Sequence, residues 1–351
     1  MKEIKLGKMK IFNFSQPYII AEIGSNHNGD MNLAHKLIDA AVECGANAVK
    51  FQSWSPTSLI SEEEYDRNQK YNDSPKKHFG SLKEMVTKYY LREEQHFELK
   101  EYCDKKNIDF CSTPFSIREV ELLDKCLVPF FKVASMDINN YQLLEKIAEK
   151  KKPVVVSTGM ATLGEIDRAV ELLYNKGAED IALLHCISIY PPAYEDINLN
   201  NIKMLQNTFD LPVGFSDHTI GYSIPLASVA LGACIIEKHF TLDKNLPGWD
   251  HEISADPSEL SIICKESKNI SKSLGLCKRT ISNSEQEKKL KFRRSIVYAR
   301  DLPEGHILSE NDLTSKRPGS GIPPDLVKLF IGRSLITNVE EDTLMKWEHI
   351  L

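Results

Sequence analysis

Polar side chains stand at the ends of short apolar runs through most of this 351-residue chain. Two of them are the lysines Lys50 and Lys132, and several others carry hydroxyl groups. The hydroxyl residues at these ends include Thr113, Ser135, Ser157, Ser188 and Ser216. Ammonium and hydroxyl groups that converge would bind an anion, most simply a phosphate or a carboxylate. A single lysine at such a place is more often structural, so this prediction depends on many ends converging.

Two histidines end consecutive apolar runs, His218 in GFSDHT and His239 in IIEKHF. On neighbouring strands their imidazoles could share one metal ion. Two neutral nitrogens without a thiolate suit Mn, Zn, Co or Fe, with substrate or water in the remaining positions. Asp217 and Glu237 flank the pair and could orient it. The alternative is two unrelated histidines that each form a hydrogen bond.

These residues need elements that carry them to one place. Eight runs have strand character and alternate with longer amphipathic segments, which is the pattern of repeated βα units. The expected strands are 18–24, 48–53, 108–114, 130–135, 153–159, 181–186, 211–217 and 234–240, and helix-like segments include 32–44, 141–150, 163–176 and 224–232. The repeat predicts an α/β fold, a closed (β/α)8 or TIM barrel, with its chemistry at the C-terminal ends of the strands. A doubly wound open sheet is the structural alternative.

Composition changes along the chain predict more than one domain. We expect the barrel in residues 1–275, a charged linker in 276–291 and a compact, mostly β module in 292–351, where Pro and Gly turns separate short apolar pieces. Within the barrel, the segment from Trp54 to about Gly80 is long and polar. Two interpretations stay open for it, a lid or substrate loop and a plain surface insertion.

Charge and composition exclude several classes of protein. Lys and Arg total 44 against 50 Asp and Glu, a net charge of -6, so no general basic surface favours nucleic acid or an anionic membrane. No apolar stretch reaches the roughly 18 residues of a membrane helix, and Lys10 interrupts the N-terminal run where a signal peptide would be apolar. Eight cysteines lie far apart, which favours buried free thiols in a reducing compartment. We therefore expect a cytoplasmic protein.

Two lysines in an anion-binding barrel would also suit a class I aldolase, where a buried lysine forms a Schiff base. No sequence feature marks Lys50 or Lys132 as that nucleophile. The segment SNHNGD is poor in glycine and the sequence has no GxGxxG motif, so nucleotide binding has no support.

The order of the motifs resembles that of the sialic acid synthase family. The motifs are AEIGSNHNGD, AVKFQ, CSTPF, FKVAS, VSTGM, GFSDHT, EKHF and PGWDHEIS, and the later segment KRPGSGIPP is similar to the SAF, or antifreeze-like, domain of these synthases. The resemblance spans nearly the whole chain. It implies a transferase that condenses phosphoenolpyruvate with an N-acetylmannosamine-like sugar to give a sialic acid-type nonulosonic acid.

The resemblance also implies roles for individual residues. Phosphoenolpyruvate contacts correspond to Lys50, Thr113, Lys132, Ser135, Ser157, Ser188 and Ser216. Sugar contacts correspond to Gln52, Tyr190 and Asp250, and Glu22 matches the acidic residue beside the metal and the reacting groups. The metal is usually Mn²⁺, with Mg²⁺ or Co²⁺ as alternatives, on His218 and His239. The family further implies a domain-swapped homodimer, in which Arg317 of one subunit reaches the sugar in the other.

Two departures from the family pattern lie near the acceptor sugar. Asp137 in ASMD stands where a glutamate usually contacts the sugar, and Trp249 makes PGWDH of the common PGPDH. The acceptor therefore stays open between N-acetylmannosamine, its 6-phosphate and a 6-deoxy diacetamido sugar. Two rival functions also stay open. One is another phosphoenolpyruvate-condensing barrel synthase, of the 3-deoxy-octulosonate 8-phosphate or heptulosonate phosphate type, and the other is a non-catalytic sugar- or ice-binding protein.

Overall fold

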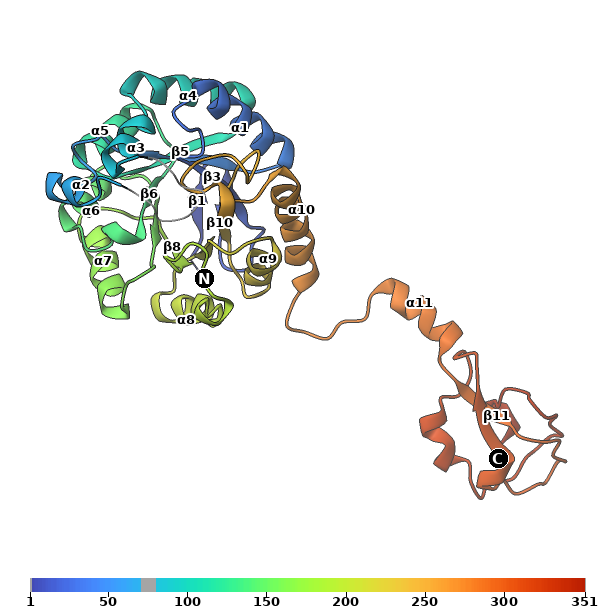
Figure 1. Ribbon diagram of the computed structural model, residues 1–351. Helices are drawn as coiled ribbons and strands as arrows, with labels where there is room; N and C mark the ends of the chain where they lie inside the picture. The colour runs from blue at the N-terminus through green and yellow to red at the C-terminus, as the bar shows by residue number, and fades with distance from the viewer. Residues whose placement is uncertain (1, 71–79, 351) are drawn as a thin grey trace. The chain divides into compact units, whose positions relative to one another are not determined.

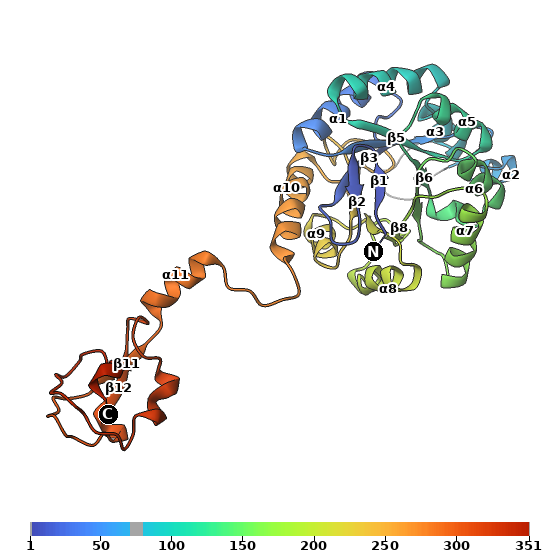
Figure 2. The ribbon, with the colours of Figure 1, turned by 180° about the vertical axis from the view of Figure 1, so that it is seen from behind.

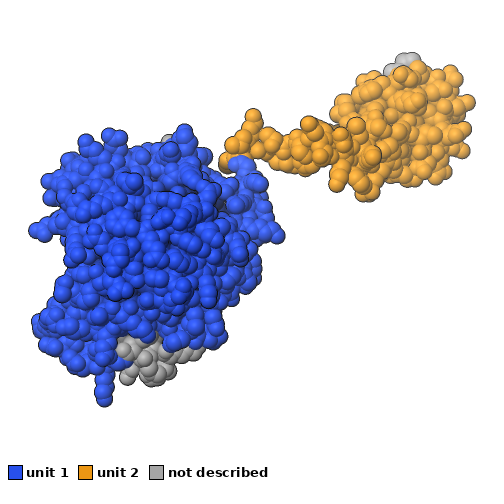
Figure 3. Space-filling model, turned by 90° about the horizontal axis from the view of Figure 1, so that it is seen from above, with its two compact units in different colours: residues 1–275 blue, residues 276–351 orange. Residues whose placement is uncertain are grey.

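The chain divides into two compact units, Met1–Gly275 and Leu276–Leu351 (Figure 3). The computed structural model describes residues 2–70 and 80–350. Each unit has a hydrophobic core of its own.

A closed barrel of parallel strands forms the first unit (Figure 1). Its strands are β3 (Tyr18–Gly24), β4 (Ala48–Ser53), β5 (Asp109–Pro114), β6 (Phe131–Val133), β7 (Val154–Ser157), β8 (Ile181–Cys186), β9 (Val213–Asp217) and β10 (Ile235–His239). They pair in the order β5-β4-β3-β10-β9-β8-β7-β6, and β5 also lies against β6, which closes the ring. The predicted TIM barrel is confirmed and the doubly wound open sheet is wrong.

Amphipathic helices cover the outside of the barrel. They are α1 (Met31–Cys44), α4 (Glu93–Lys106), α5 (Ile117–Lys125), α6 (Tyr141–Ala148), α7 (Leu163–Asn175), α8 (Asn200–Phe209), α9 (Ser223–Ala230) and α10 (Pro257–Leu274). In α7, Thr162 and Glu165 form a capping box, and the buried face recurs at helical spacing in Ile166, Ala169 and Leu173. These faces pack on the outward side chains of the strands, which leaves the inward side chains free to build a site.

A hairpin absent from the sequence prediction closes the N-terminal end of the barrel (Figure 2). Its strands are β1 (Ile4–Leu6) and β2 (Met9–Ile11). The apolar side chains of the hairpin pack on inward residues of the barrel strands. Water is thereby kept from that end, and the opposite end of the barrel remains for ligands.

The long segment after β4 builds a small core of its own. It contains α2 (Glu62–Arg67) and α3 (Leu82–Lys88), and residues 71–79 of the predicted Trp54–Gly80 loop lie outside the described residues. The buried side chains are Trp54, Tyr65, Leu82, Met85, Val86 and Tyr89. The described part of the segment is thus packed structure, and Trp54 and Leu59 bring it to the cavity described below.

The second unit is a small domain with short strands. Helix α11 (Asn283–Phe292) lies largely within the predicted linker, and β11 (Ser295–Tyr298) pairs antiparallel with β12 (Leu313–Lys316). Short 3-10 turns occur in both units, namely η1 (Ser135–Asp137), η2 (Tyr194–Asp196), η3 (His251–Ile253), η4 (Glu310–Asp312), η5 (Pro324–Leu329) and η6 (Trp347–His349). Across the described residues, no helix is long and apolar enough to cross a membrane. All eight cysteines are free thiols, and six of them are buried as predicted, whereas Cys44 is partly buried and Cys277 is exposed.

Asp312 anchors the second unit, and its replacement by asparagine is expected to loosen that unit alone. Burial by itself would raise the pKa of this carboxyl, but hydrogen bonds from His306, Ser309 and Arg300 outweigh burial and hold the pKa far below its usual range. A depressed carboxyl pKa stabilises the fold above the unfolded value, about 3.9, and this contribution is lost as pH falls through the folded value. We expect Asp312→Asn to remove about 1–3 kcal/mol at neutral pH.

Amide hydrogen exchange of the full-length protein measures this loss of stability in the second unit, because the protection of peptides from each unit is determined separately. Peptides from 292–351 should lose protection in the variant, and those from the barrel should not. Wild-type protein brought below about pH 4 should lose protection in the same peptides. Unchanged protection in the variant would contradict the assigned role of Asp312.

Candidate active site

A cavity of about 780 Å³ opens at the C-terminal ends of the barrel strands. It gathers side chains that are far apart in sequence, because alternate residues of every strand point inward. The predicted site residues that line it are Glu22, Lys50, Gln52, Thr113, Lys132, Ser135, Ser157, Ser188, Tyr190, Ser216, His218, His239 and Asp250. The convergence on which the anion prediction depended is therefore present.

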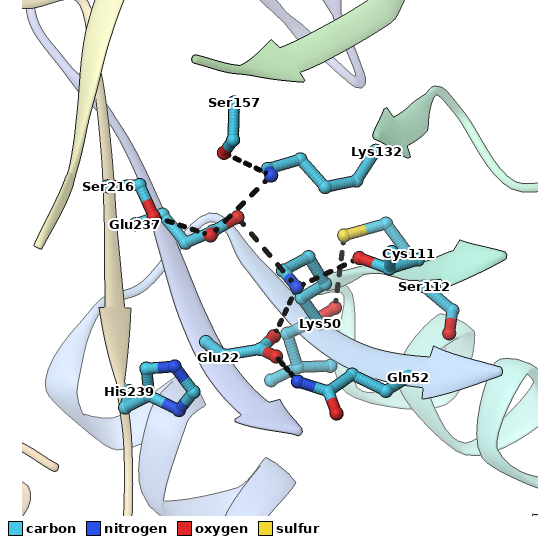
Figure 4. Close-up of polar contacts among 12 residues, drawn as sticks. Glu22, Lys50, Gln52, Cys111, Ser112, Lys132, Ser157, Ser216, Glu237 and His239 are labelled. Carbon is cyan, nitrogen blue, oxygen red and sulfur yellow. Dashed lines mark hydrogen bonds and ion pairs between the residues drawn. The ribbon is translucent and has the colours of Figure 1, made fainter. Parts of the chain in front are cut away.

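Two lysines and two carboxylates form a charge cluster in the floor of the cavity (Figure 4). Lys50 Nζ lies 2.8 Å from Glu22 Oε2 and 3.9 Å from Glu237 Oε2. Lys132 Nζ lies 3.8 Å from Glu237 Oε1, which also accepts a hydrogen bond from Ser216 at 2.9 Å. All four charged side chains are buried, so their attraction is little screened by solvent. Glu237 thus bridges the two lysines, a role that the sequence analysis did not assign to it.

The pKa values of the cluster show how burial and charge compete there. Burial and the charge of Glu237 raise the pKa of Glu22, against the attraction of Lys50. Burial lowers the pKa of Lys132, whereas the two carboxylates raise the pKa of Lys50 despite its burial. The charges of the four groups cancel overall, so the cluster can exclude water without burying a net charge.

Hydroxyl and amide groups surround the lysines and form a cradle. Lys132 Nζ donates to Ser157 Oγ at 2.6 Å, and Lys50 Nζ donates to Thr113 Oγ1 at 3.1 Å. The backbone N–H of Gly159 donates to Ser135 Oγ at 3.0 Å. A Cβ at Gly159 would lie 2.4 Å from Ser188 Oγ and 2.8 Å from Ser135 Oγ, so only glycine leaves this space open. The sequence analysis named these hydroxyl residues and overlooked Gly159.

The two histidines lie side by side at the ends of β9 and β10. Their ring centroids are 5.4 Å apart, and the ring of Tyr190 lies 4.1 Å from that of His218. His218 Nδ1 donates to the carbonyl of Ile187 at 2.7 Å, which leaves its Nε2 as the acceptor nitrogen in the neutral ring. His239 Nδ1 is buried without a hydrogen-bond partner, 3.7 Å from Asp250 Oδ2. Burial is the largest cause that lowers the pKa of His239 well below its usual range.

This arrangement fits a divalent metal, because it supplies one imidazole whose orientation is fixed by a backbone hydrogen bond and, next to it, a buried ring nitrogen without a hydrogen-bond partner. Within the described residues, no group of three or more His, Cys, Asp or Glu side chains could hold a metal. The protein would therefore contribute the two imidazoles, and other ligands would come from substrate or water.

The loop after β10 carries Asp250 and is held in place by the loop that follows the neighbouring strand β3. Asn26 Nδ2 donates to Ser254 Oγ at 2.9 Å, and Ser254 Oγ donates to the carbonyl of Asp250 at 2.7 Å. Asn28 Nδ2 donates to the carbonyl of Pro247 at 2.9 Å. The segment SNHNGD, which offered no phosphate loop, thus holds in place the loop that carries Asp250.

Three residues that the sequence singled out lie elsewhere. Asp137 is not among the described residues that line the cavity, because the turn η1 directs it to Asn140, whose Nδ2 lies 3.1 Å away, and its neighbour Met136 lines the cavity. Arg317 belongs to the second unit, where its guanidinium lies 5.2 Å from the ring centroid of Phe292. Asp217 does not orient a histidine. It points out of the barrel and pairs with Lys238 at 2.7 Å.

Other residues of the cavity were missed. Cys186, predicted only as a buried thiol, lines the cavity. The apolar lining residues include Trp54, Leu59, Phe115, Met136, Met160, Ile189, Ile220 and Trp249, which lie in loops that follow strands. The sequence analysis named Trp249 beside Asp250 and Trp54 as the start of a long loop. The other six lie one to six residues after a strand end, and this position is their only sequence signal.

A barrel that gathers two lysines, two carboxylates and two histidines around one cavity at the C-terminal ends of its strands has the arrangement of an enzyme active site. Models of known families agree with this class. The NeuB family model matches residues 37–279, and the SAF domain model matches residues 293–351. The chain belongs to the NeuB family, and the predicted resemblance to sialic acid synthases is confirmed.

Individual relatives are similar over nearly their whole length. An N,N'-diacetyllegionaminic acid synthase of Campylobacter jejuni is 43% identical over 334 residues, covering 93% of this chain and 98% of the relative. An N-acetylneuraminate-9-phosphate synthase of Homo sapiens is 36% identical, covering 94% and 91%. The solved structure of an N-acetylneuraminic acid (sialic acid) synthetase from Leptospira borgpetersenii is 40% identical, with a TM-score of 0.72, covering 82% of this chain and 95% of that one. These relatives are synthases, and this chain is an enzyme of their family.

Proposed function

We propose that this enzyme joins phosphoenolpyruvate to an N-acetylmannosamine-type amino sugar, with water, and releases a nonulosonic acid and phosphate. One observation carries the proposal: a single cavity holds two buried lysines with a hydroxyl cradle beside a pair of histidines. Lysines with hydroxyl and amide donors suit the phosphate and carboxylate of phosphoenolpyruvate. The histidine pair suits a divalent metal.

Charge balance supports a divalent cofactor, Mn²⁺ first and Mg²⁺ or Co²⁺ as alternatives. The two lysines already offset Glu22 and Glu237, whereas phosphoenolpyruvate would add a phosphate and a carboxylate. A cation next to these groups would offset the added negative charge. Bound to His218 and His239, such an ion would supply Lewis-acid polarisation of the sugar's aldehyde.

The protein's own side chains would bind phosphoenolpyruvate and transfer the proton of the attacking water. In the proposed reaction, the C2=C3 double bond of phosphoenolpyruvate opens as C3 forms a bond to the aldehyde carbon, whose oxygen gains a proton and becomes a hydroxyl. Water loses a proton and adds to C2, and the C2–O bond to phosphate then breaks, which leaves a 2-keto acid and phosphate. Lys132 and Lys50, each with its hydroxyl partner, would hold the phosphate and the carboxylate with donors that need no reorganisation. Glu22, fixed by Gln52 Nε2 at 2.9 Å, would accept the proton of the attacking water.

We further propose a domain-swapped homodimer, in which the SAF domain of one subunit covers the cavity mouth of the other. Four apolar side chains at the mouth support this proposal, because Met136, Met160, Ile189 and Ile220 are 61%, 71%, 52% and 54% exposed. Apolar side chains gathered at one mouth favour a covering partner. Arg317 of the covering domain would then orient the sugar. The free thiols support a reducing compartment, the cytoplasm.

Phosphate release from phosphoenolpyruvate tests the function. Metal-stripped enzyme, with Mn²⁺ restored, would be assayed with N-acetylmannosamine, its 6-phosphate and a 6-deoxy diacetamido sugar. Release that requires both the metal and one of these sugars would support the proposal. Release only with a pentose or tetrose phosphate would instead identify a synthase of the 3-deoxy-octulosonate or heptulosonate type.

Removal of either histidine is expected to abolish metal binding as well as turnover. His218→Ala and His239→Ala each remove one of the two protein ligands, so Mn²⁺ affinity should fall by more than about 100-fold. Binding of free Mn²⁺, followed by electron paramagnetic resonance, measures this without substrate. His35→Ala is the matched control, because His35 lies outside the cavity and is paired with Glu98. Unchanged Mn²⁺ affinity in both site variants would refute the metal assignment.

A further inference from the structure

We propose that one apolar wall of the cavity is the subsite for the methyl of the second acetamido group of a diacetamido acceptor, a group that N-acetylmannosamine lacks, and that this wall makes the enzyme select a diacetamido sugar. The wall consists of Trp54, Leu59, Phe115 and Trp249, and all four side chains line the cavity. The inference rests on the proposed function and names the acceptor class that this function left open.

The wall is rigid because it is the inner surface of a packed core. The side chain of Trp54 is buried, its indole N–H donates to the carbonyl of Val86 at 3.1 Å, and its ring lies 6.2 Å from that of Phe115. Leu59, Phe115 and Trp249 pack against the same buried cluster, which the residues of α3 complete. A surface held in this way can discriminate between substituents, whereas a mobile side chain would adapt to either.

The position of the wall places it on the acceptor side of the cavity. The loops that carry it follow β4, β5 and β10, which lie close together in the strand order. Lys132, Ser157 and Ser188 of the anion cradle come from β6, β7 and the loop after β8, on the other arc of the barrel, whereas Lys50 and Thr113 come from β4 and β5 themselves. Trp54 follows Gln52 by two residues and Trp249 directly precedes Asp250. A ligand on this side therefore meets a polar floor and an apolar wall.

That combination matches an acetamido group, which carries an amide for the floor and a methyl for the wall. A phosphate on the acceptor would face aromatic rings instead. Among the described residues of the lining, the lysines and arginines are Lys50 and Lys132, both in the floor. Burial of one methyl group in a fitted pocket is worth roughly 10–200-fold in specificity.

The comparison with relatives supports two acetamido groups. Phosphoenolpyruvate contains no nitrogen, so both acetamido groups of a diacetyl nonulosonic acid must come from the acceptor. The relative named for such a product, from Campylobacter jejuni, is 43% identical to this chain, and the relatives named for an N-acetylneuraminic acid product and for its 9-phosphate are 40% and 36% identical.

Trp249→Ala is the decisive variant, and Trp249→Phe is its conservative partner. The measured quantity is the ratio of kcat/KM for the 6-deoxy diacetamido sugar to that for N-acetylmannosamine. We expect Trp249→Ala to lower this ratio at least about tenfold, Trp249→Phe to keep most of it, and the KM for phosphoenolpyruvate to stay unchanged in both. Phe97→Ala is the matched control, because this aromatic residue of α4 is exposed outside the cavity. An unchanged ratio in Trp249→Ala would overturn the subsite.

Tryptophan fluorescence separates failure of the subsite from failure of the proposed function. In the wild type, the diacetamido sugar should change the emission of Trp54 and Trp249 at concentrations where N-acetylmannosamine does not. An emission change without phosphate release would overturn the proposed reaction and leave the subsite supported. Phosphate release from the diacetamido sugar without any emission change would overturn the subsite and support the reaction.

Discussion

Lys50→Met is expected to lower kcat/KM for phosphoenolpyruvate by roughly 10²–10³-fold, the effect of removing one preorganised donor from a developing charge. Lys50 is buried, and its ammonium contacts both carboxylates of the cluster and the Thr113 hydroxyl. Methionine keeps the length and the apolar stem and removes only the charge and the donors. Phosphate release at saturating sugar measures the loss, and a variant within about threefold of wild type would refute the role.

The same substitution is expected to destabilise the barrel, which must be separated from the loss of chemistry. Without Lys50, Glu22 lacks its nearest opposite charge, and removing one partner of a buried pair costs about 3–5 kcal/mol. The double variant Lys50→Met/Glu22→Gln removes both partners, so we expect it to recover much of the free energy of unfolding and none of the activity. Urea unfolding of the three proteins measures this. Recovery of activity in the double variant would mean that Lys50 acts only through stability.

The strands and the polar floor could be predicted because a barrel imposes strict local patterns. β3, β4 and β8 begin and end at the predicted residues, since each is an apolar run bounded by polar or turn residues. Two-residue alternation then puts Lys50 and Gln52 on one side of their strand. Parallel strands bring all such ends to one face. Local sequence therefore determines both the strands and their convergence on the cavity.

The parts that could not be predicted depend on contacts between elements far apart in sequence. Glu237 bridges Lys50 and Lys132 only because β10, β4 and β6 surround the same interior. The requirement for glycine at position 159 can be recognised only from the structure, in which the Ser135 and Ser188 hydroxyls occupy the space that a Cβ would need. Asp217 and Glu237 precede equivalent histidines in the sequence, yet only Glu237 points inward, because Asp217 lies one residue from His218 and Glu237 lies two from His239.

The small core after β4 and the N-terminal hairpin could not be predicted either, because their packing also depends on elements far apart in sequence. The segment after β4 is rich in charge, and its few apolar residues show no long periodic pattern. They form a core only because Phe115 and Trp249 arrive from other loops to complete it. The hairpin strands are three residues each and gain their burial from the barrel floor. Tertiary packing therefore stabilises the segment after β4 and the hairpin more than their intrinsic helix or strand propensity does.

Two inactive variants are expected to restore one another if the subunits exchange their SAF domains. Lys132→Met removes a barrel residue and Arg317→Ala removes a residue of the second unit. In a mixed dimer with swapped domains, one active site receives native Lys132 from one chain and native Arg317 from the other. Random mixing gives about half mixed dimers with one good site each, so activity should return to about a quarter of wild type. Phosphate release at limiting sugar, after the dimers have exchanged subunits, measures this.

The matched control combines Lys132→Met with Lys50→Met, because both substitutions lie in the barrel. Every site of that mixture carries one of the two defects, however the domains are arranged, so its activity should stay at the level of the separate variants. If the Arg317→Ala mixture also stays at that level while mixed dimers are present, each site must be completed within one chain. The exposed rim of Met136, Met160, Ile189 and Ile220 would then need another cover. Restoration would instead mean that assembly, and not the barrel alone, completes the acceptor site.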